Sequence, residues 1–263
     1  MIKKLKAKDK REILNFCYKN ERENLFAIGS FKNYEDPFSE VVYYGYFTDG
    51  EIMGLATYYK KHKNFVINAL KKEVVRALVD YAVEDKISVE FVANFEKFAT
   101  PTIQRLKKYG ITPKETSSET VYVLSQNEFT DFSKGNEDRA TVEDIDEVVA
   151  LQNEDNGQLI TEEDRGKIIP HQEFLIRDGN KIVSKANIHG VSEKYFQIGG
   201  VGTLKEFRGR GYAKQIVSYL CKNYFDEGKK YGLLFTANDN ASAIAVYEKI
   251  GFKPVEEFTI ARY

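Results

Sequence analysis

Two segments in the C-terminal half carry residues whose types and spacing could do chemistry. The first is a glycine-rich turn, Arg208-Gly-Arg-Gly-Tyr-Ala213, which opens a stretch with helical periodicity. Glycines at a helix start let backbone N–H groups approach an anion, and the helix N-terminus adds unpaired donors and positive partial charge. Arg208 and Arg210 can add charge-assisted contacts. The turn therefore predicts a phosphate or pyrophosphate site, with a plain strand-to-helix turn as the simpler interpretation.

The turn differs from the two commonest phosphate motifs. It lacks the Lys-Ser/Thr pair that ends a G-x-x-x-x-G phosphate loop, and it lacks the third glycine of the dinucleotide fingerprint G-x-G-x-x-G. The turn alone is therefore weak evidence for a ligand class.

The second segment is Asn240-Ala-Ser-Ala243-Ile-Ala-Val-Tyr247-Glu-Lys-Ile-Gly251-Phe252. Asn240 can cap a helix that Gly251 ends. On that helix the phenol of Tyr247 can give a proton to a leaving group, which is general acid catalysis. The alternative for Tyr247 is a packed aromatic on the inner helix face.

Both segments occur in order, with a short apolar run (residues 232–237) between them. They resemble the R/Q-x-x-G-x-G/A and N-x-x-A-x-x-x-Y-E-K-x-G-F signatures of the GNAT acyltransferase superfamily, and the resemblance covers about residues 139–263. It implies an acetyl-CoA-dependent N-acetyltransferase. The residues that it implies would hold acetyl-CoA, through its acetyl and pantetheine groups, its pyrophosphate and the rest of the CoA arm, are Val201, Gly202, Thr203, Arg208, Gly209, Arg210, Gly211, Tyr212, Ala213, Lys214 and Asn240. It also implies that Tyr247 protonates the departing CoA thiolate.

The elements around these motifs occur in the same order in both halves of the chain. Each half predicts a helix, a hairpin, a strand, a helix, a strand, a helix and a final strand, with Asp-Gly hairpin turns at residues 49–50 and 178–179. We interpret this as an internal repeat. The predicted divisions are a first module (1–126), a polar linker (127–138) and an acetyl-CoA-binding module (139–263).

The predicted fold class is α/β (α+β), with two tandem GNAT-like modules. The resemblance implies that each is a mixed, mostly antiparallel sheet flanked by helices, and that the sheet of the second module splays after the strand Tyr195–Thr203. The first half has only Leu70-Lys-Lys-Glu73 where the second half has its glycine-rich turn. The first module is therefore predicted to be a degenerate copy without the pyrophosphate motif.

The composition of the chain limits the classes of partner that we expect it to bind. The formal net charge is -1, which gives no support for nucleic-acid binding. No apolar run approaches the ~18 residues of a spanning helix, and the two cysteines have no metal-ligand spacing. The expectations are a cytoplasmic protein without a metal site or a membrane partner. A small-molecule or peptide amine is the predicted acceptor, and the sequence leaves homodimerisation open.

The general base is the missing part of the pattern. Neither strand that carries a glutamate in some GNAT proteins, here residues 195–201 and 233–236, contains a carboxylate. A water relay remains open. Five further candidates, each with a surface role as its simpler interpretation, are His189, Glu154, Asp155, Glu162 and Glu163. The C-terminal carboxylate of Tyr263 is another candidate. The alternatives to an enzyme are a non-catalytic CoA-binding or regulatory interaction protein, and a nucleotide-binding protein.

Overall fold

The structure, a computed structural model, describes residues 1–156, 165–166, 168 and 170–263, without the side chains of residues 155 and 156. The chain forms two compact units, and neither unit is one continuous segment. Unit 1 comprises Met1–Val121, Phe235–Asp239 and Val255–Tyr263, and unit 2 comprises Tyr122–Leu234 and Asn240–Pro254. Among the described residues, no helix is both long and apolar enough to cross a membrane.

Unit 1 is a mostly antiparallel sheet with helices packed against it. Its strands run in the order β1-β2-β3-β4-β5-β12, and only β4 and β5 pair in parallel. The strands are β1 (Ile2–Leu5), β2 (Val41–Thr48), β3 (Glu51–Tyr59), β4 (Asn64–Ala69), β5 (Phe91–Phe95) and β12 (Lys253–Arg262), the last from residue 255 on. The helices are α1 (Lys10–Lys19), α2 (Leu25–Asn33), α3 (Pro37–Glu40), α4 (Lys72–Glu84) and α5 (Glu96–Lys107).

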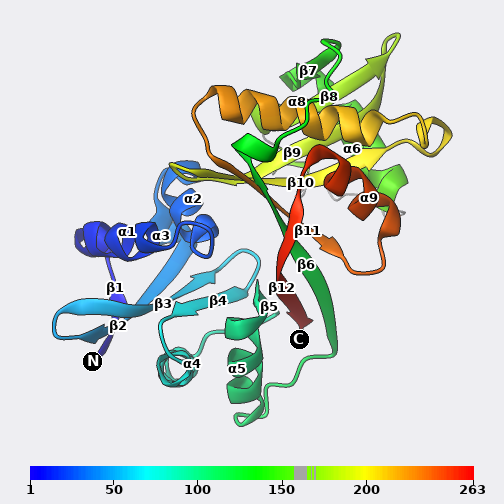
Figure 1. Cartoon of the computed structure of the whole chain (residues 1–263). Coiled ribbons are helices and arrows are strands. Elements are labelled where there is room, and N and C mark those ends of the chain that lie inside the picture. The colour runs from blue at the N-terminus through cyan, green and yellow to red at the C-terminus, as the bar shows by residue number, and fades with distance from the viewer. Residues whose placement is uncertain (157–164, 167, 169) are drawn as a thin grey trace. The chain divides into compact units, whose positions relative to one another are not determined.

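The predicted hairpin between β2 and β3 is confirmed, and turn chemistry explains it. Asp49 and Gly50 both have positive φ, 49° and 83°, as a type I′ turn requires. After β4 the apolar residues of α4 recur with helical spacing, and Val74, Leu78 and Val79 are buried. Helices α4 and α5 contact each other and the sheet beside them (Figure 1).

Unit 2 has the same order of strands and the same strand senses, with α6 among its described residues where unit 1 has α1, α2 and α3. Its sheet runs β11-β10-β9-β8-β7, with β10 and β11 parallel and the other pairs antiparallel. The strands are β7 (Glu137–Arg139), β8 (Glu173–Asp178), β9 (Lys181–Val191), β10 (Tyr195–Thr203) and β11 (Tyr231–Ala237), the last up to residue 234. The helices are α6 (Ile145–Asn156), α8 (Tyr212–Asp226) and α9 (Ala241–Ile250). Strand β6 (Glu115–Ser125) has its first residues in unit 1 and its last in unit 2.

Helix α8 lies against β8, β9 and β10 (Figure 1). Phe196 of β10 stacks on Tyr224 of α8, with ring centroids 4.9 Å apart. Phe174 of β8 contacts the same tyrosine at 6.3 Å. This apolar layer holds the C-terminal part of α8 against the sheet, and the helix begins at Tyr212, in the segment of the predicted site.

Strands β10 and β11 are paired over only part of their length. Their register covers Tyr195↔Tyr231, Phe196↔Gly232 and Gln197↔Leu233, whereas β10 stays paired with β9 as far as Thr203. The implied splay is therefore present in unit 2, and it begins inside β10 at residue 198 rather than after the strand ends.

The structure confirms the predicted mixed, mostly antiparallel sheets flanked by helices, but it changes the predicted boundaries. The final strand of the second half pairs with β5 and belongs to unit 1, because Phe258–Arg262 hydrogen-bond to Phe91–Phe95. The ring of Phe258 also contacts Phe95 at 5.7 Å and Phe235 at 4.3 Å. A single cut in the sequence therefore does not separate the units.

The predicted linker 127–138 is folded as part of unit 2. Phe129 packs on Phe225 of α8, with ring centroids 5.3 Å apart. Glu137 is buried and accepts hydrogen bonds from the backbone N–H of Lys134 and from the amide of Gln215. The polar composition misled the prediction, because Phe129, Phe132 and the buried carboxylate of Glu137 anchor the segment.

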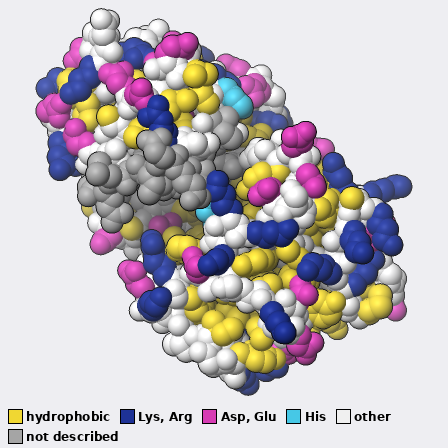
Figure 2. Space-filling model, turned by 180° about the vertical axis from the view of Figure 1, so that it is seen from behind, with side chains coloured by type: hydrophobic (Ala, Val, Ile, Leu, Met, Phe, Trp, Pro, Cys, Tyr) yellow, Lys and Arg dark blue, Asp and Glu magenta, His cyan; other side chains and the backbone are white. Residues whose placement is uncertain are grey.

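Figure 2 shows one face of the molecule, on which Lys and Arg side chains are interspersed with apolar, acidic and other side chains. That face carries both signs of charge, as the net charge of -1 for the whole chain suggests.

Candidate active site

The glycine-rich turn connects β10 to α8 in a conformation that requires glycine. Gly209 and Gly211 have φ of +76° and +87°, and a Cβ added at either would meet nothing within 4 Å. The requirement is therefore one of backbone conformation and not of space. Gly211 is also the N-cap residue of α8.

The two arginines of the turn are held by the turn itself. The Nε of Arg208 donates to the carbonyl of Thr203 at 3.0 Å, and an Nη of Arg210 donates to the carbonyl of Glu206 at 3.1 Å. The guanidinium of Arg210 also lies over the ring of Phe207, 4.9 Å from its centroid. These contacts place two permanent positive charges beside the first turn of α8.

The start of α8 supplies hydrogen-bond donors. The first helical bond runs from the backbone N–H of Gln215 to the carbonyl of Gly211, so the N–H groups just before Gln215 have no carbonyl partner within the helix. Together with the helix dipole they favour an anion.

The end of β10 supplies a second row of backbone groups. Gly202 and Thr203 pair with β9 on one side, where the hydroxyl of Ser184 donates to the carbonyl of Gly202 at 2.9 Å. On the other side the register with β11 has ended at Gln197. The edge of Val201–Thr203 that faces away from β9 is therefore available to a ligand's amides, except for the carbonyl of Thr203, which accepts from Arg208.

Helix α9 brings the second motif to the site. The side-chain oxygen of Asn240 caps the helix by accepting from the backbone N–H of Ala243 at 3.2 Å and from the hydroxyl of Ser242 at 3.0 Å. The capping prediction for Asn240 is thereby confirmed, and its side-chain oxygen already has two donors.

Tyr247 is 6% exposed, and its ring contacts Phe252 at 6.0 Å and Tyr122 at 6.5 Å. Burial raises the pKa of Tyr247 to about 12. The phenol therefore holds its proton at neutral pH, as a general acid must. A thiolate formed in the same apolar surroundings is also desolvated, so its pKa rises with that of its proton donor.

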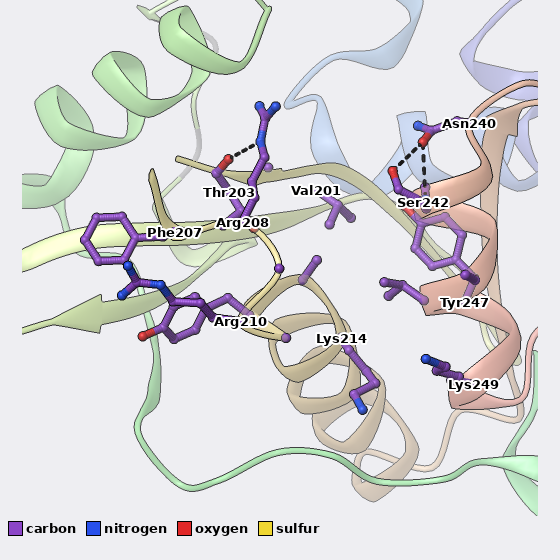
Figure 3. Close-up of a pocket in the computed structure, with 18 residues that line it drawn as sticks. Val201, Thr203, Phe207, Arg208, Arg210, Lys214, Asn240, Ser242, Tyr247 and Lys249 are labelled. Carbon is purple, nitrogen blue, oxygen red and sulfur yellow. Dashed lines mark hydrogen bonds between the residues drawn. The ribbon is translucent and has the colours of Figure 1, made fainter. Parts of the chain in front are cut away.

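All twelve predicted site residues line one pocket in unit 2, with a volume of about 780 Å³ (Figure 3). Four of the lining residues are cationic: Arg208, Arg210, Lys214 and Lys249. None of the described lining residues is Asp or Glu. Such a pocket attracts a polyanion.

Six further residues line the pocket: Phe207, Ser242, Ala243, Ala245, Val246 and Lys249. Ala243 and Val246 share an apolar helical face with Tyr247, and no role for Lys249 was predicted from the sequence. Helical spacing offers a signal, because Val246 and Lys249 are three residues apart and Asn240 and Ala243 likewise. Pattern alone does not say whether such a face meets a core or a cavity.

The candidates for the base are scattered. A carboxylate oxygen of Glu154 accepts from the backbone N–H of Lys205 at 3.0 Å. The carbonyl oxygen of Tyr263 accepts from Nζ of Lys114 in unit 1 at 3.0 Å. Glu162 and Glu163 lie outside the described residues, as does the side chain of Asp155. His189 lies on β9, next to the strand that lines the pocket.

Comparison with known proteins relates the segment that carries this pocket to a known family. Residues 125–252, which contain the turn, β10, β11 and α9 and make up just under half of the chain, match the model of the Acetyltransferase (GNAT) family. Proteins of this family are acetyltransferases, and the matched segment contains the whole pocket.

Solved GNAT structures resemble the chain over its full length. A tandem GNAT protein from the clavulanic acid biosynthesis pathway is 12% identical, with a TM-score of 0.66, covering 100% of this chain and 98% of that one. A GNAT acetyltransferase from Colwellia psychrerythraea is 13% identical, with a TM-score of 0.59, covering 100% and 99%. At such identities the likeness shows the fold alone.

One curated relative matches a shorter segment. A mycothiol acetyltransferase from Corynebacterium efficiens is 29% identical over 87 residues. The match covers 33% of this chain and 29% of that relative, so the chain matches less than a third of the relative's length.

Proposed function

We propose that the protein transfers an acetyl group from acetyl-CoA to the amine of a small molecule or peptide. The observation that carries the proposal is the pocket itself. It joins a glycine turn at a helix N-terminus, an unpaired strand edge and a protonated phenol in one cavity of about 780 Å³.

The residues of the pocket fit the parts of acetyl-CoA. Backbone N–H groups between Gly209 and Lys214, with the cations around them, suit the pyrophosphate. The free edge of Val201–Thr203 suits the pantetheine amides, which both donate and accept hydrogen bonds. The turn and the strand therefore set a direction, with the phosphates beside α8 and the acyl end toward the point where β10 leaves β11.

Tyr247 then acts on the leaving group. As the acceptor nitrogen bonds to the thioester carbonyl carbon, the C–S bond breaks and the sulfur gains negative charge. The phenol of Tyr247 gives its proton to that sulfur, and the products are an amide and the free thiol.

The second candidate function is a CoA-binding protein without catalysis. It is favoured by the absence of Asp and Glu from the described lining residues, because an ammonium must lose protons before it attacks. The retained phenol of Tyr247 favours the enzyme, since a simple binder needs no proton donor there.

Thiol release distinguishes the two. The purified protein is incubated with acetyl-CoA and a panel of primary amines, and free thiol and acetylated amine are measured. The enzyme forms both in equal amounts. If acetyl-CoA binds but neither product exceeds the rate without protein, the binding function replaces the proposal.

A further inference from the structure

The side chain of His189 occupies the space beside β10 at the point where that strand leaves β11. The register of β9 with β10 passes from Gln197↔Gly190 to Ile198↔Ile188, so His189 is the extra residue of a β-bulge. A Cβ added to Gly199 would lie 2.2 Å from Cε1 of the histidine ring. Glycine at position 199 is therefore what lets the ring lie over β10.

The ring lies on the face of the sheet opposite α8. Phe196 packs on Tyr224 of α8, and successive side chains of a strand alternate between faces. The Cβ direction of Gly199 therefore points away from α8, and the ring of His189 lies in that direction. Helix α9, which carries Tyr247, contacts α8. The histidine and the phenol thus approach the strand end from opposite faces.

A buried ion pair shares this side of β9. Nζ of Lys185 donates to Glu173 at 3.0 Å, and these two side chains are 2% and 5% exposed. The amide of Asn187 donates to the other carboxylate oxygen of Glu173 at 2.9 Å. Both carboxylate oxygens are thus engaged, so Glu173 is poorly placed to accept a proton from a ligand.

His189 is exposed, in contrast to this pair. Desolvation nevertheless lowers the pKa of His189, with the negative charge of Glu173 acting to raise it and the positive charge of Lys185 acting to lower it. Protein atoms surround the ring while water still reaches part of it. Among the described residues, Glu173 from β8 and Lys185 from β9 are the charged groups that act on it. The imidazole is therefore neutral near pH 7 and can accept a proton.

We propose that His189 is the general base of the reaction and that the acceptor amine approaches from its face of the sheet. This inference rests on the proposed acetyl transfer. Gly199 is two residues before Val201, which lines the pocket. A register shift with Gly200 at positive φ lies between them, so their Cα atoms are at most about 7 Å apart. An acyl group at the strand end lies between the ring of His189 on one face and the phenol of Tyr247 on the other.

The protons then balance. An acceptor that arrives as an ammonium first gives one proton to the unprotonated ring nitrogen of His189, which passes it to solvent. The amine lone pair then forms the C–N bond at the carbonyl carbon, and the nitrogen gives its second proton to the same ring nitrogen. The C–S bond breaks, and Tyr247 gives its proton to the sulfur. Solvent afterwards takes the proton from the imidazolium and returns one to the phenolate.

The test uses His189→Gln with His171→Gln as the matched control, since His171 is exposed and lies outside the pocket. The probes are n-butylamine, which is protonated at neutral pH, and hydroxylamine, which is not. We expect His189→Gln to lower kcat with n-butylamine by about a hundredfold or more. With hydroxylamine the loss is smaller, and acetyl-CoA affinity is retained in both variants.

The pH dependence of kcat distinguishes a catalytic role of His189 from a structural one, because a purely structural residue would not change it. The neutral imidazole is the active form, so wild-type kcat falls as pH drops through a value below 6.5, and this limb is absent in His189→Gln. In His189→Gly, added imidazole restores activity.

Four results overturn the inference. An unchanged kcat in His189→Gln shows that another group takes the proton, as does an unchanged acid limb in an active variant. If the variant loses activity but imidazole does not rescue His189→Gly, the residue has a structural role. If the wild type acetylates neither probe nor any other amine, the proposed function fails and the inference fails with it.

Discussion

Each unit contains one pair of parallel strands, β4 and β5 in unit 1 and β10 and β11 in unit 2, and the space where the two strands separate differs between the units. In unit 1 the parallel strands β4 and β5 share one register position, Asn64↔Phe91. Beyond it the amide of Asn94 donates to the carbonyl of Ile67 at 2.6 Å, and the backbone N–H of Ala93 donates to the side-chain oxygen of Asn64 at 3.3 Å. In unit 2 the strands β10 and β11 also part, but the gap opens onto a pocket.

The connection from the first strand of this pair to the next helix differs between the units. In unit 1 residues 70–71 join β4 directly to α4, whereas in unit 2 residues 204–211 form a turn with two glycines at positive φ before α8. Asparagine side chains are long enough to replace missing ladder hydrogen bonds, and in unit 1 those of Asn64 and Asn94 form hydrogen bonds across the space between β4 and β5. We therefore propose that only unit 2 binds acetyl-CoA, and that unit 1 keeps the fold without the site.

Gly211→Asp should have the largest effect on this difference. A carboxylate at the N-cap accepts the N–H groups that would meet the pyrophosphate and repels it, so we expect acetyl-CoA affinity to fall about a hundredfold, because like-charge contacts cost several kcal/mol. The control is Gly50→Asp in unit 1, where φ is +83° and a Cβ also meets nothing. Calorimetry should show normal affinity in the control. Equal losses in both variants would mean that backbone strain, not the site, is responsible.

Tyr247→Phe removes one oxygen from the pocket and leaves the ring contacts. We expect kcat to fall about tenfold or more with little change in acetyl-CoA affinity, since general acids contribute at least that much. Tyr224→Phe is the control, because Tyr224 is a buried tyrosine of α8 outside the pocket. Steady-state kinetics that show the same kcat for Tyr247→Phe and wild type would rule out the acid role.

The decrease of kcat at high pH depends on the raised pKa of Tyr247. The acid form of Tyr247 is the active one and is lost as pH rises through its pKa of about 12, whereas an ordinary phenol would lose it near ~10. We expect kcat to hold its value between about pH 9 and about pH 10.5, as measured in short assays with a stability check at each pH. A fall centred near ~10 that disappears in Tyr247→Phe would show that the phenol has an ordinary pKa.

Asn94→Ala tests the hydrogen bond by which the side chain of Asn94 bridges β5 and β4 in unit 1. It leaves the buried carbonyl of Ile67 without the side-chain donor of Asn94, and we expect a loss of about 1–3 kcal/mol in the free energy of unfolding, measured in urea. The control is Asn33→Ala at the exposed end of α2. Acetyl-CoA affinity should not change in either variant. A gain of acetyl-CoA binding in Asn94→Ala would show that the bridge is what closes a latent second site.

Lys249→Gln should have the smallest effect. Its charge lies at the rim of the pocket, and exposed ion pairs contribute about 0.2–1 kcal/mol, so we expect acetyl-CoA affinity to fall about threefold and its salt dependence to weaken. Lys222→Gln is the control, because this exposed lysine of α8 lies outside the pocket. Identical salt dependence in wild type and Lys249→Gln would place the phosphates away from this side chain.

Local patterns were enough to predict most of the residues that line the pocket. The glycines of the turn and the cap at Asn240 depend on contacts within a few residues, so their spacing carries the information. Lys249 was missed because helix periodicity does not distinguish a face that meets a core from one that meets a cavity. The bridging role of Asn94 was missed because its partner, the carbonyl of Ile67, is distant in sequence.

The unit boundaries could not be predicted for the same physical reason. Strand pairing is non-local, and the pattern of Val255–Tyr263 is the same whichever sheet it joins. Its place beside β5 depends on the rings of Phe95, Phe235 and Phe258, which come from three separate segments. The linker was misread because polar composition hid the two phenylalanines that anchor it.

The most direct test of the central claim is the stoichiometry of acetyl-CoA binding by the intact chain, measured by calorimetry with active-protein concentration determined independently. We predict one site per chain, in the pocket formed by β10, α8 and α9. Two sites per chain would show that unit 1 also binds the co-substrate, and no binding would leave the GNAT fold without the function proposed for it.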